Sequence, residues 1–202
     1  MDCHKFEEII SHHCSPVLMG EKPANLVSFS KEKMPELPDI MKMYEEKLAD
    51  EDIYMEVICG CRKHYLVLVY RKEVLEEYLK QPEVVELLVQ DGYSKNGELK
   101  EKFSYLRKRF EEKKEFPHEI GLFLGYPLED VKGFRINSGA GCKFCGYWKV
   151  YGDVEKAKLQ FEVYDRCRAF VCGQIKQGYS ILQILADYGN RNILQLQSGG
   201  TK

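Results

Sequence analysis

Several features that would point directly to a function are missing from this sequence. The longest strongly apolar run is YLVLVY, residues 65–70, whereas a membrane-spanning helix needs about 20 apolar residues. No basic start leads into an apolar segment, so we expect neither export nor insertion into a membrane. Thirty basic side chains stand against 32 acidic ones, and the net charge of −2 disfavours a general binder of nucleic acid.

Phosphate-binding motifs are missing as well. The stretch SGAGCKFCG lacks the G-x-G-x-x-G spacing, and no G-x-x-x-x-G-K-[ST] occurs, so nucleotide hydrolysis is not expected. Tryptophan occurs once, whereas cysteine occurs eight times. Without a secretory signal these cysteines should stay reduced or bind metal, which favours a cytoplasmic location.

Hydrophobic periodicity predicts many helices and a few strands. Strands are expected over 24–30, 53–61, 64–71 and 146–152, of which the second and third form an antiparallel hairpin with 64–71 as a central strand. Helices are expected over 4–14, 35–50, 72–80, 82–91, 97–114, 117–127, 128–134, 153–177 and 180–188. The first helix should end before Ser15, because proline disfavours the helical conformation in the preceding residue.

No internal repeat, low-complexity segment or long linker divides the chain. We therefore predict one α+β domain over residues 1–197, followed by a flexible tail over 198–202. The domain should contain a small, mostly antiparallel sheet of three to five strands covered by helices.

The stretch GCKFCGYWKVYGD, residues 141–153, concentrates rare residue types. Cys142 and Cys145 have the spacing of a zinc knuckle or a redox dithiol. Cys59 and Cys61 occupy alternate strand positions, should face the same way, and would complete a four-thiolate site for zinc or an iron–sulfur cluster. Alternatively, Cys59 and Cys61 are buried thiols on the apolar face of the hairpin. A thioredoxin-type site is disfavoured, because the cysteine pair precedes a strand instead of opening a helix.

The strand that follows offers a platform for a ligand. Tyr147, Lys149 and Tyr151 should share one face, with Trp148 on the other. A lysine between two aromatic rings suits an anionic planar ligand such as a flavin or a nucleotide phosphate. The alternative is an edge strand with a solvent-facing lysine and with Trp148 anchored in the core.

Two further groups combine titratable side chains. His12, His13 and Cys14 offer imidazole and thiol, which are the components of a nucleophile and base or of a metal site. Adjacent helix residues diverge by about 100°, so these three cannot all face one point. His118 and Glu119 form a second acid–base pair, or a helix start with its carboxylate near the positive end of the helix dipole.

Four blocks of the chain resemble the uncharacterised bacterial family called domain-of-unknown-function family 3793. They are HHCSPVLMGEKPANL, HYLVLVYR, FPHEIGLFLGYPLEDVKGF and CGYWKVYGDVEKAKLQFEVYDRCR, and the resemblance spans roughly residues 9–185. It implies a small cytoplasmic protein of largely anaerobic bacteria, associated with flavodoxin-type neighbours and with electron transfer or with iron or haem handling. The family assigns no catalytic residues, and Cys59, Cys61 and Cys142 lie outside its signature blocks.

From these residues we predict a redox-associated protein that binds a cofactor or metal, with iron, zinc, haem and flavin as the candidates. Cys14 and Cys145 would supply thiol chemistry or ligation, and His118 a proton or a ligand bond. The residues predicted to contact the cofactor are Lys22, Tyr147, Trp148 and Lys149, and those predicted to bind metal are Cys142 and Cys145.

Two alternatives stay open. In the first, the chain is a non-catalytic partner that docks a flavodoxin-type electron carrier on a basic patch of Lys22 and Lys149. In the second, it is an enzyme with Cys14 as nucleophile. The predicted site requires the N-terminal cysteine segment and the tryptophan-bearing strand to come together around a shared cavity.

Overall fold

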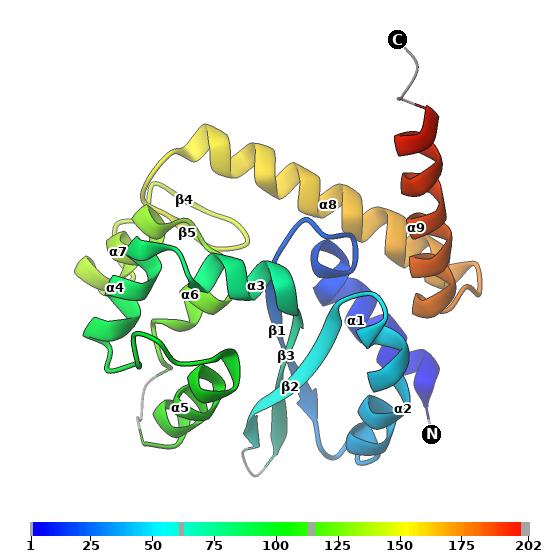
Figure 1. The fold of residues 1–202 in the computed structure, drawn as a ribbon, viewed down its shortest axis with the longest axis horizontal. Helices are drawn as coiled ribbons and strands as arrows, with labels where there is room; N and C mark the ends of the chain where they lie inside the picture. The colour runs from blue at the N-terminus through cyan, green and yellow to red at the C-terminus, as the bar shows by residue number, and fades with distance from the viewer. Residues whose placement is uncertain (1, 61–62, 113–115, 199–202) are drawn as a thin grey trace.

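A three-stranded antiparallel sheet forms the centre of the fold in the computed structural model, which describes residues 2–60, 63–112 and 116–198 (Figure 1). Its strands are β1 (Ala24–Ser30), β2 (Ile53–Gly60) and β3 (His64–Arg71), in the order β1-β3-β2. A separate two-stranded sheet pairs β4 (Phe144–Cys145) with β5 (Lys149–Val150). The predicted α+β class, the hairpin and the central position of β3 are confirmed.

Helices cover both faces of the three-stranded sheet. Those described are α1 (Cys3–Leu18), α2 (Leu37–Ala49), α3 (Lys72–Leu79), α4 (Pro82–Gln90), α5 (Leu99–Glu112), α6 (Ile120–Phe123), α7 (Leu128–Ile136), α8 (Val154–Lys176) and α9 (Ile181–Ser198). Of the strand predicted over 146–152, only β5 forms. Gly146 to Trp148 form a turn instead, in which the Gly146 amide donates to the Trp148 carbonyl at 3.0 Å. The last helix is longer than predicted, and residues 199–202 of the predicted tail lie outside the described residues.

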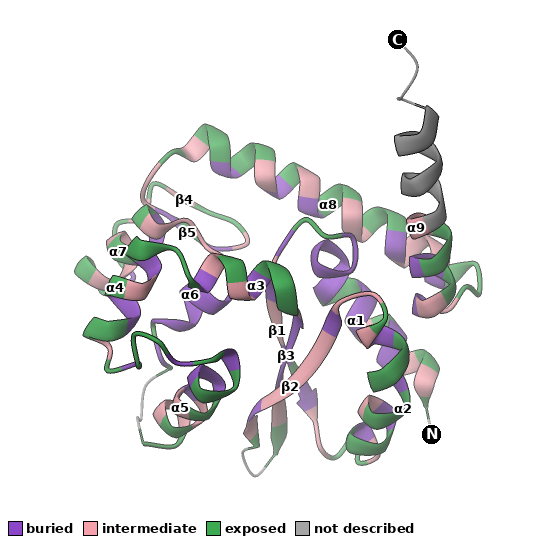
Figure 2. Ribbon diagram, viewed as in Figure 1, coloured by how far each residue is buried: buried purple, intermediate pink, exposed green. Residues whose placement is uncertain are grey.

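Each face of the sheet has its own core, as the buried segments in Figure 2 show. Val67 and Val69 of β3 pack with α1, α2, α8 and α9, whereas Leu68 and Tyr70 pack with α3 to α7. This division follows from the alternation of side chains along a strand. A third, smaller cluster joins the β4–β5 hairpin to α8 through Trp148.

A β-bulge in β2 changes the face on which Cys59 lies. Val57 pairs with Val67, whereas Cys59 pairs with Leu66, so the register shifts between them. Because neighbouring residues of β3 face opposite sides, Cys59 lies on the other face from Val57, and the predicted alternation is wrong at this point. Cys61 lies outside the described residues.

The first helix continues past its predicted end and includes Pro16. Its last turn is held by Arg71 of β3, whose Nε and Nη2 donate to the carbonyls of Val17 and Leu18, both at 2.7 Å. Val17 and Leu18 are fully buried. Tertiary packing and this cap therefore override the local preference against a helical residue before proline.

Candidate functional site

The loop between α1 and β1 places Lys22 in the protein interior. Its side chain is only 3% exposed, and its Nζ donates to Asn25 Oδ1 at 2.6 Å. The same Nζ lies 5.2 Å from the ring centre of Tyr126 and 5.9 Å from that of Tyr164. No carboxylate in the described part of the chain pairs with it. The aromatic faces and one amide therefore stabilise an ammonium group whose burial is costly.

Cys14 of α1 belongs to the same buried cluster. Its thiol is fully buried and hydrogen-bonds to the Asn25 side chain, which also holds Lys22. Burial raises the pKa of Cys14 to about 12, although the nearby Lys22 acts in the opposite direction. Burial likewise lowers the pKa of Lys22 to about 8, against the influence of Cys14. At neutral pH the thiol therefore keeps its proton, and most Lys22 side chains are charged.

Trp148 joins this cluster through Tyr126. The two rings stack with centres 5.2 Å apart, and Trp148 also packs edge-on against Phe161 at 4.5 Å. The indole Nε1 donates to Asp130 Oδ2 at 2.6 Å. The N-terminal cysteine segment and the tryptophan-bearing hairpin are thus connected by ring contacts. They meet as packed side chains, since Cys14, Lys22 and Trp148 are all buried.

His118 and Lys149 are exposed, and both lie near the Phe134 ring. The His118 ring centre is 5.1 Å from that of Phe134, and Lys149 Nζ is 5.8 Å from it. Lys149 also donates to the Gly139 carbonyl at 2.7 Å. His118 is exposed, whereas Glu119 is buried against Arg109, whose Nε donates to it at 2.6 Å. The two neighbours therefore face different surroundings, in contrast to the acid–base pair considered from sequence.

Tyr147 turns toward α8 instead of flanking Lys149. Its hydroxyl donates to Asp165 Oδ1 at 2.8 Å and accepts a hydrogen bond from Arg168, whose guanidinium carbon lies 5.0 Å from the ring centre. The predicted arrangement of a lysine between two tyrosine rings occurs instead at Lys22, with Tyr126 and Tyr164.

The cysteine pair of the hairpin is open to solvent on one side. Cys145 is exposed and Cys142 is half-buried. Cys145 belongs to β4, whereas Cys142 precedes that strand, and the amide of Lys143 between them donates to the Val150 carbonyl at 2.8 Å. Among the described residues, no group of three or more His, Cys, Asp or Glu side chains could hold a metal ion. The predicted metal role of Cys142 and Cys145 gains no support.

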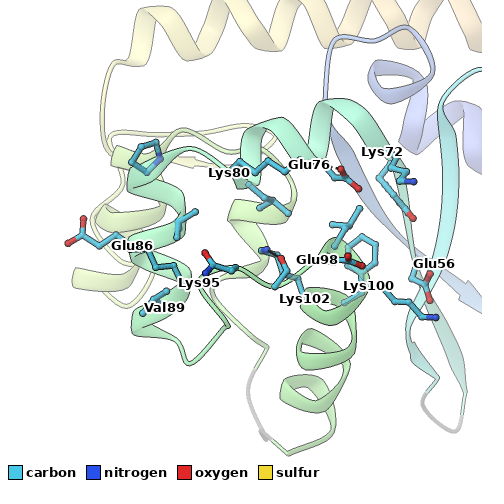
Figure 3. A pocket seen from close by; sticks show the side chains of 18 of the residues that line it. Glu56, Lys72, Glu76, Lys80, Glu86, Val89, Lys95, Glu98, Lys100 and Lys102 are labelled. Atoms are coloured by element: carbon cyan, nitrogen blue, oxygen red, sulfur yellow. Dashed lines mark hydrogen bonds and ion pairs between the residues drawn. The ribbon is translucent and has the colours of Figure 1, made fainter.

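Sequence reasoning missed a large groove between α3 and α4 on one side and α5 and β2 on the other (Figure 3). Its volume is about 1450 Å³. The charged residues that line it are Lys72, Lys80, Lys95, Lys100, Lys102, Arg107, Glu56, Glu76, Glu86 and Glu98. They come from separate helices, a strand and the loop between α4 and α5, so no local signal in the sequence predicted the groove.

The groove carries an excess of positive charge, with six cationic and four acidic side chains. Two of the cations are neutralised: Lys80 pairs with Glu76 at 3.5 Å, and Arg107 with Glu56 at 2.5 Å. Lys95 and Lys100, in contrast, form no ion pair in the described part of the chain.

Two further features affect the charge of the groove. Lys102 is buried and donates to the Gly97 carbonyl, and its burial lowers its pKa, which weakens its positive charge relative to an exposed lysine. In Figure 3 the Glu86 carboxylate points away from the centre of the groove. The interior of the groove therefore attracts anions.

Apolar and aromatic side chains form the floor of the same groove. Tyr70 and Phe103 contact one another edge to face, with ring centres 5.1 Å apart. Leu79, Val85 and Leu99 extend this apolar lining. A groove that is lined by aromatic side chains and by lysines without an ion pair in the described part of the chain matches a ligand that has both an anionic group and an apolar body.

A family model described as a protein of unknown function (DUF3793) matches residues 10–185, most of the chain. No curated protein and no solved structure matches significantly. Within the described residues, none of the helices has the length and apolar character needed to cross a membrane.

Proposed function

Since the chain belongs to the DUF3793 family of proteins of unknown function, we propose a function from its own groove. The groove between α3, α4, α5 and β2 holds an organic anion with a planar aromatic body. Flavin nucleotides and haem are the members of this class that the sequence also suggests. The observation that carries the proposal is that Lys95 and Lys100, which form no ion pair within the described ranges, line a groove with an aromatic floor.

The size of the groove supports an occupant larger than a simple ion. Ligand pockets commonly measure about 300–1,000 Å³, and the groove exceeds that range at about 1450 Å³. A nucleotide-sized or porphyrin-sized compound can occupy such a space while leaving its anionic end near the lysines. Inorganic iron or zinc needs a cluster of ligating side chains, which the described residues do not offer.

The charges support recognition of a phosphate or a carboxylate. A lysine that already has a carboxylate partner gains little from a second anion, whereas Lys95 and Lys100 have no such partner among the residues that the structure describes. Lys102 adds a third ammonium group at the same end of α5. Because these charges lie at an open groove, their attraction should weaken as salt concentration rises.

The two other predicted functions gain less support from the placement of their residues. A basic docking patch for a flavodoxin-type carrier cannot include Lys22, which is buried. An enzyme with Cys14 as nucleophile would need a thiolate, and burial raises the pKa of that thiol to about 12. The redox role and the cytoplasmic location stay predictions.

A binding experiment with three probes tests the proposal. Flavin mononucleotide and riboflavin are titrated by fluorescence quenching and haem by its absorption spectrum, at low and moderate salt. We expect flavin mononucleotide or haem to bind with a Kd in the micromolar range. We expect riboflavin, which lacks the phosphate, to bind at least tenfold more weakly than flavin mononucleotide.

Reversing the charge of two groove lysines tests whether the anion binds in the groove. The double variant Lys95→Glu/Lys100→Glu should weaken anion binding by about tenfold or more, since four units of charge change at roughly 8 Å in a screened setting. The matched control is Lys132→Glu, an exposed lysine of α7 outside the groove, which should leave binding unchanged. The proposal fails if no probe binds below about 1 mM, or if both variants weaken binding equally.

A further inference from the structure

The Cys14–Lys22 cluster shares no residue with the groove, and it contains a thiol and an amine, two groups that can react with each other. The Asn25 side chain hydrogen-bonds to both the Cys14 thiol and the Lys22 amine, so one amide brings sulfur and nitrogen together. Each group is also an electrostatic neighbour of the other. The amide of Asn25 is fixed in turn, because its Nδ2 donates to the His13 carbonyl at 2.7 Å.

The surroundings leave the pair few other reaction partners. Cys14 is fully buried and Lys22 is 3% exposed, so thiols of the size of glutathione cannot reach them without an opening of the fold. A peroxide is far smaller and can enter packed interiors through ordinary fluctuations. No second cysteine is an interaction partner of Cys14 in the described part of the chain, and all described cysteines are free thiols.

We propose that Cys14 and Lys22 form an oxidative modification site, at which a hydroperoxide converts the pair into a covalent sulfur–nitrogen link. In the first step the peroxide oxidises the Cys14 thiol to a sulfenic acid, and the peroxide is reduced to water. In the second step the Lys22 amine attacks that sulfur, a sulfur–nitrogen bond forms, and the sulfenic hydroxyl leaves with an amine proton as water. The protein loses two hydrogen atoms, and a thiol reductant restores both side chains.

The state of the two groups sets the pH dependence of this reaction. Attack on sulfur needs the neutral amine, and burial lowers the pKa of Lys22 to about 8, so the reactive form increases steeply between pH 7 and 9. The thiol keeps its proton over this range, because burial raises its pKa to about 12, which makes its oxidation slow. Transfer of the thiol proton to the neutral Lys22 amine would generate the thiolate locally, and this step also becomes easier as Lys22 loses its charge.

Titratable groups from neighbouring elements also face the pair. Besides Asn25, the rings of Tyr126 and Tyr164 enclose the Lys22 amine, and Glu21 is an electrostatic neighbour of Tyr164. Burial raises the pKa of Tyr126 to about 12, so this phenol stays neutral between pH 7 and 9. The change of reactivity in this window therefore comes from Lys22.

Peptide mapping of the full chain tests the proposal directly. A glutamate-specific protease cuts after Glu8, Glu21 and Glu32, which separates the peptide 9–21, with Cys14 as its only cysteine, from the peptide 22–32, which has none. After treatment with hydrogen peroxide under non-reducing conditions, we expect the two peptides to stay joined, with a mass two hydrogens below their sum. Dithiothreitol should separate them, and the yield should rise at least fivefold from pH 7 to pH 9.

Two variants serve as controls. Lys22→Arg keeps a positive charge but offers a poor nucleophile, and Cys14→Ser removes the sulfur, so neither should give joined peptides. Cys145→Ser removes the exposed thiol and should leave the yield unchanged. The proposal is refuted if Cys14 of the unmodified sequence becomes sulfinic or sulfonic acid without joining the peptides, or if it stays a thiol while Cys145 is oxidised. This readout needs no variant to fold.

Discussion

The substitution Lys22→Met should stabilise the protein at neutral pH. Lys22 has an ordinary pKa of 10.5, and its burial lowers this to about 8, which corresponds to about 3 kcal/mol of folding free energy lost by burying the ammonium group. Because the side chain is only 3% exposed, solvent screening does not reduce this figure much. Methionine fills a similar volume, while loss of the hydrogen bond to Asn25 costs about 1 kcal/mol. The expected net gain at pH 7 is about 2 kcal/mol.

The gain should shrink as pH rises, and the direction follows from proton linkage. Below pH 8 both the folded and the unfolded protein carry a charged Lys22, so the full penalty of burial is present. Between pH 8 and 10.5 the unfolded state binds more protons than the folded state, and the stability of the unmodified protein therefore rises with pH. Cys14 acts oppositely above pH 9, because the folded state keeps its thiol proton up to about pH 12. The effect of Lys22 on stability is therefore best measured between pH 7 and pH 9.

Urea unfolding at pH 7, 8 and 9 measures this effect, followed by the fluorescence of Trp148, the only tryptophan. The difference in unfolding free energy between Lys22→Met and the unmodified protein should narrow by about 1 kcal/mol from pH 7 to pH 9. Lys132→Met, at an exposed position of α7, is the control and should show a constant difference. A difference that stays constant for Lys22→Met as well would mean that the Lys22 amine does not titrate in this window, and the reasoning about its burial would be wrong.

Two further predictions concern the tryptophan-bearing hairpin and helix α8. Asp130 accepts hydrogen bonds from the Trp148 indole and from the backbone amides of Tyr151 and Gly152, at 2.6 to 2.8 Å. The substitution Asp130→Ala removes this acceptor, so it should lower the free energy of unfolding in urea by about 3 kcal/mol and shift the tryptophan emission to the red. An unchanged emission maximum would contradict this role of Asp130. Gly146→Ala places a Cβ 2.2 Å from the Phe161 ring and should lower the melting temperature. Gly173→Ala, in the last turn of α8 with open space around the added Cβ, should raise it slightly, and equal effects of the two substitutions would contradict the packing argument.

The sheet was predictable because its signals are local. β3 is apolar at consecutive positions and β2 alternates, and these patterns depend only on neighbouring residues. The bulge at Cys59 was not predictable, because it depends on the register with β3. The end of α1 was predicted wrongly for a similar reason. The helix continues through Pro16, and the Arg71 side chain that caps it comes from a strand more than 50 residues away.

The contacts between the predicted site residues were not predictable from the sequence. The resemblance to the family singled out Cys14, Lys22 and Trp148, but a lysine in a loop with glycine and proline has the local sequence of a surface residue. Its burial results from Tyr126 and Tyr164, which are more than 100 residues away along the chain. The groove was not predicted for the same reason. Its lysines belong to separate elements, and hydrophobic periodicity does not show how those elements pack together.

The groove and the buried lysine are connected by a short series of contacts. Tyr78 of α3, the helix that contributes Lys72 and Glu76 to the groove, donates its hydroxyl to the Tyr126 carbonyl at 2.9 Å. The Tyr126 ring in turn covers Lys22. One hydrogen bond and one cation–π contact are each worth about 1 kcal/mol, so coupling between a ligand in the groove and the state of Lys22 is limited to about 1–2 kcal/mol along this route. That bound corresponds to a change of roughly 5- to 30-fold in either equilibrium, and it must be the same in both directions.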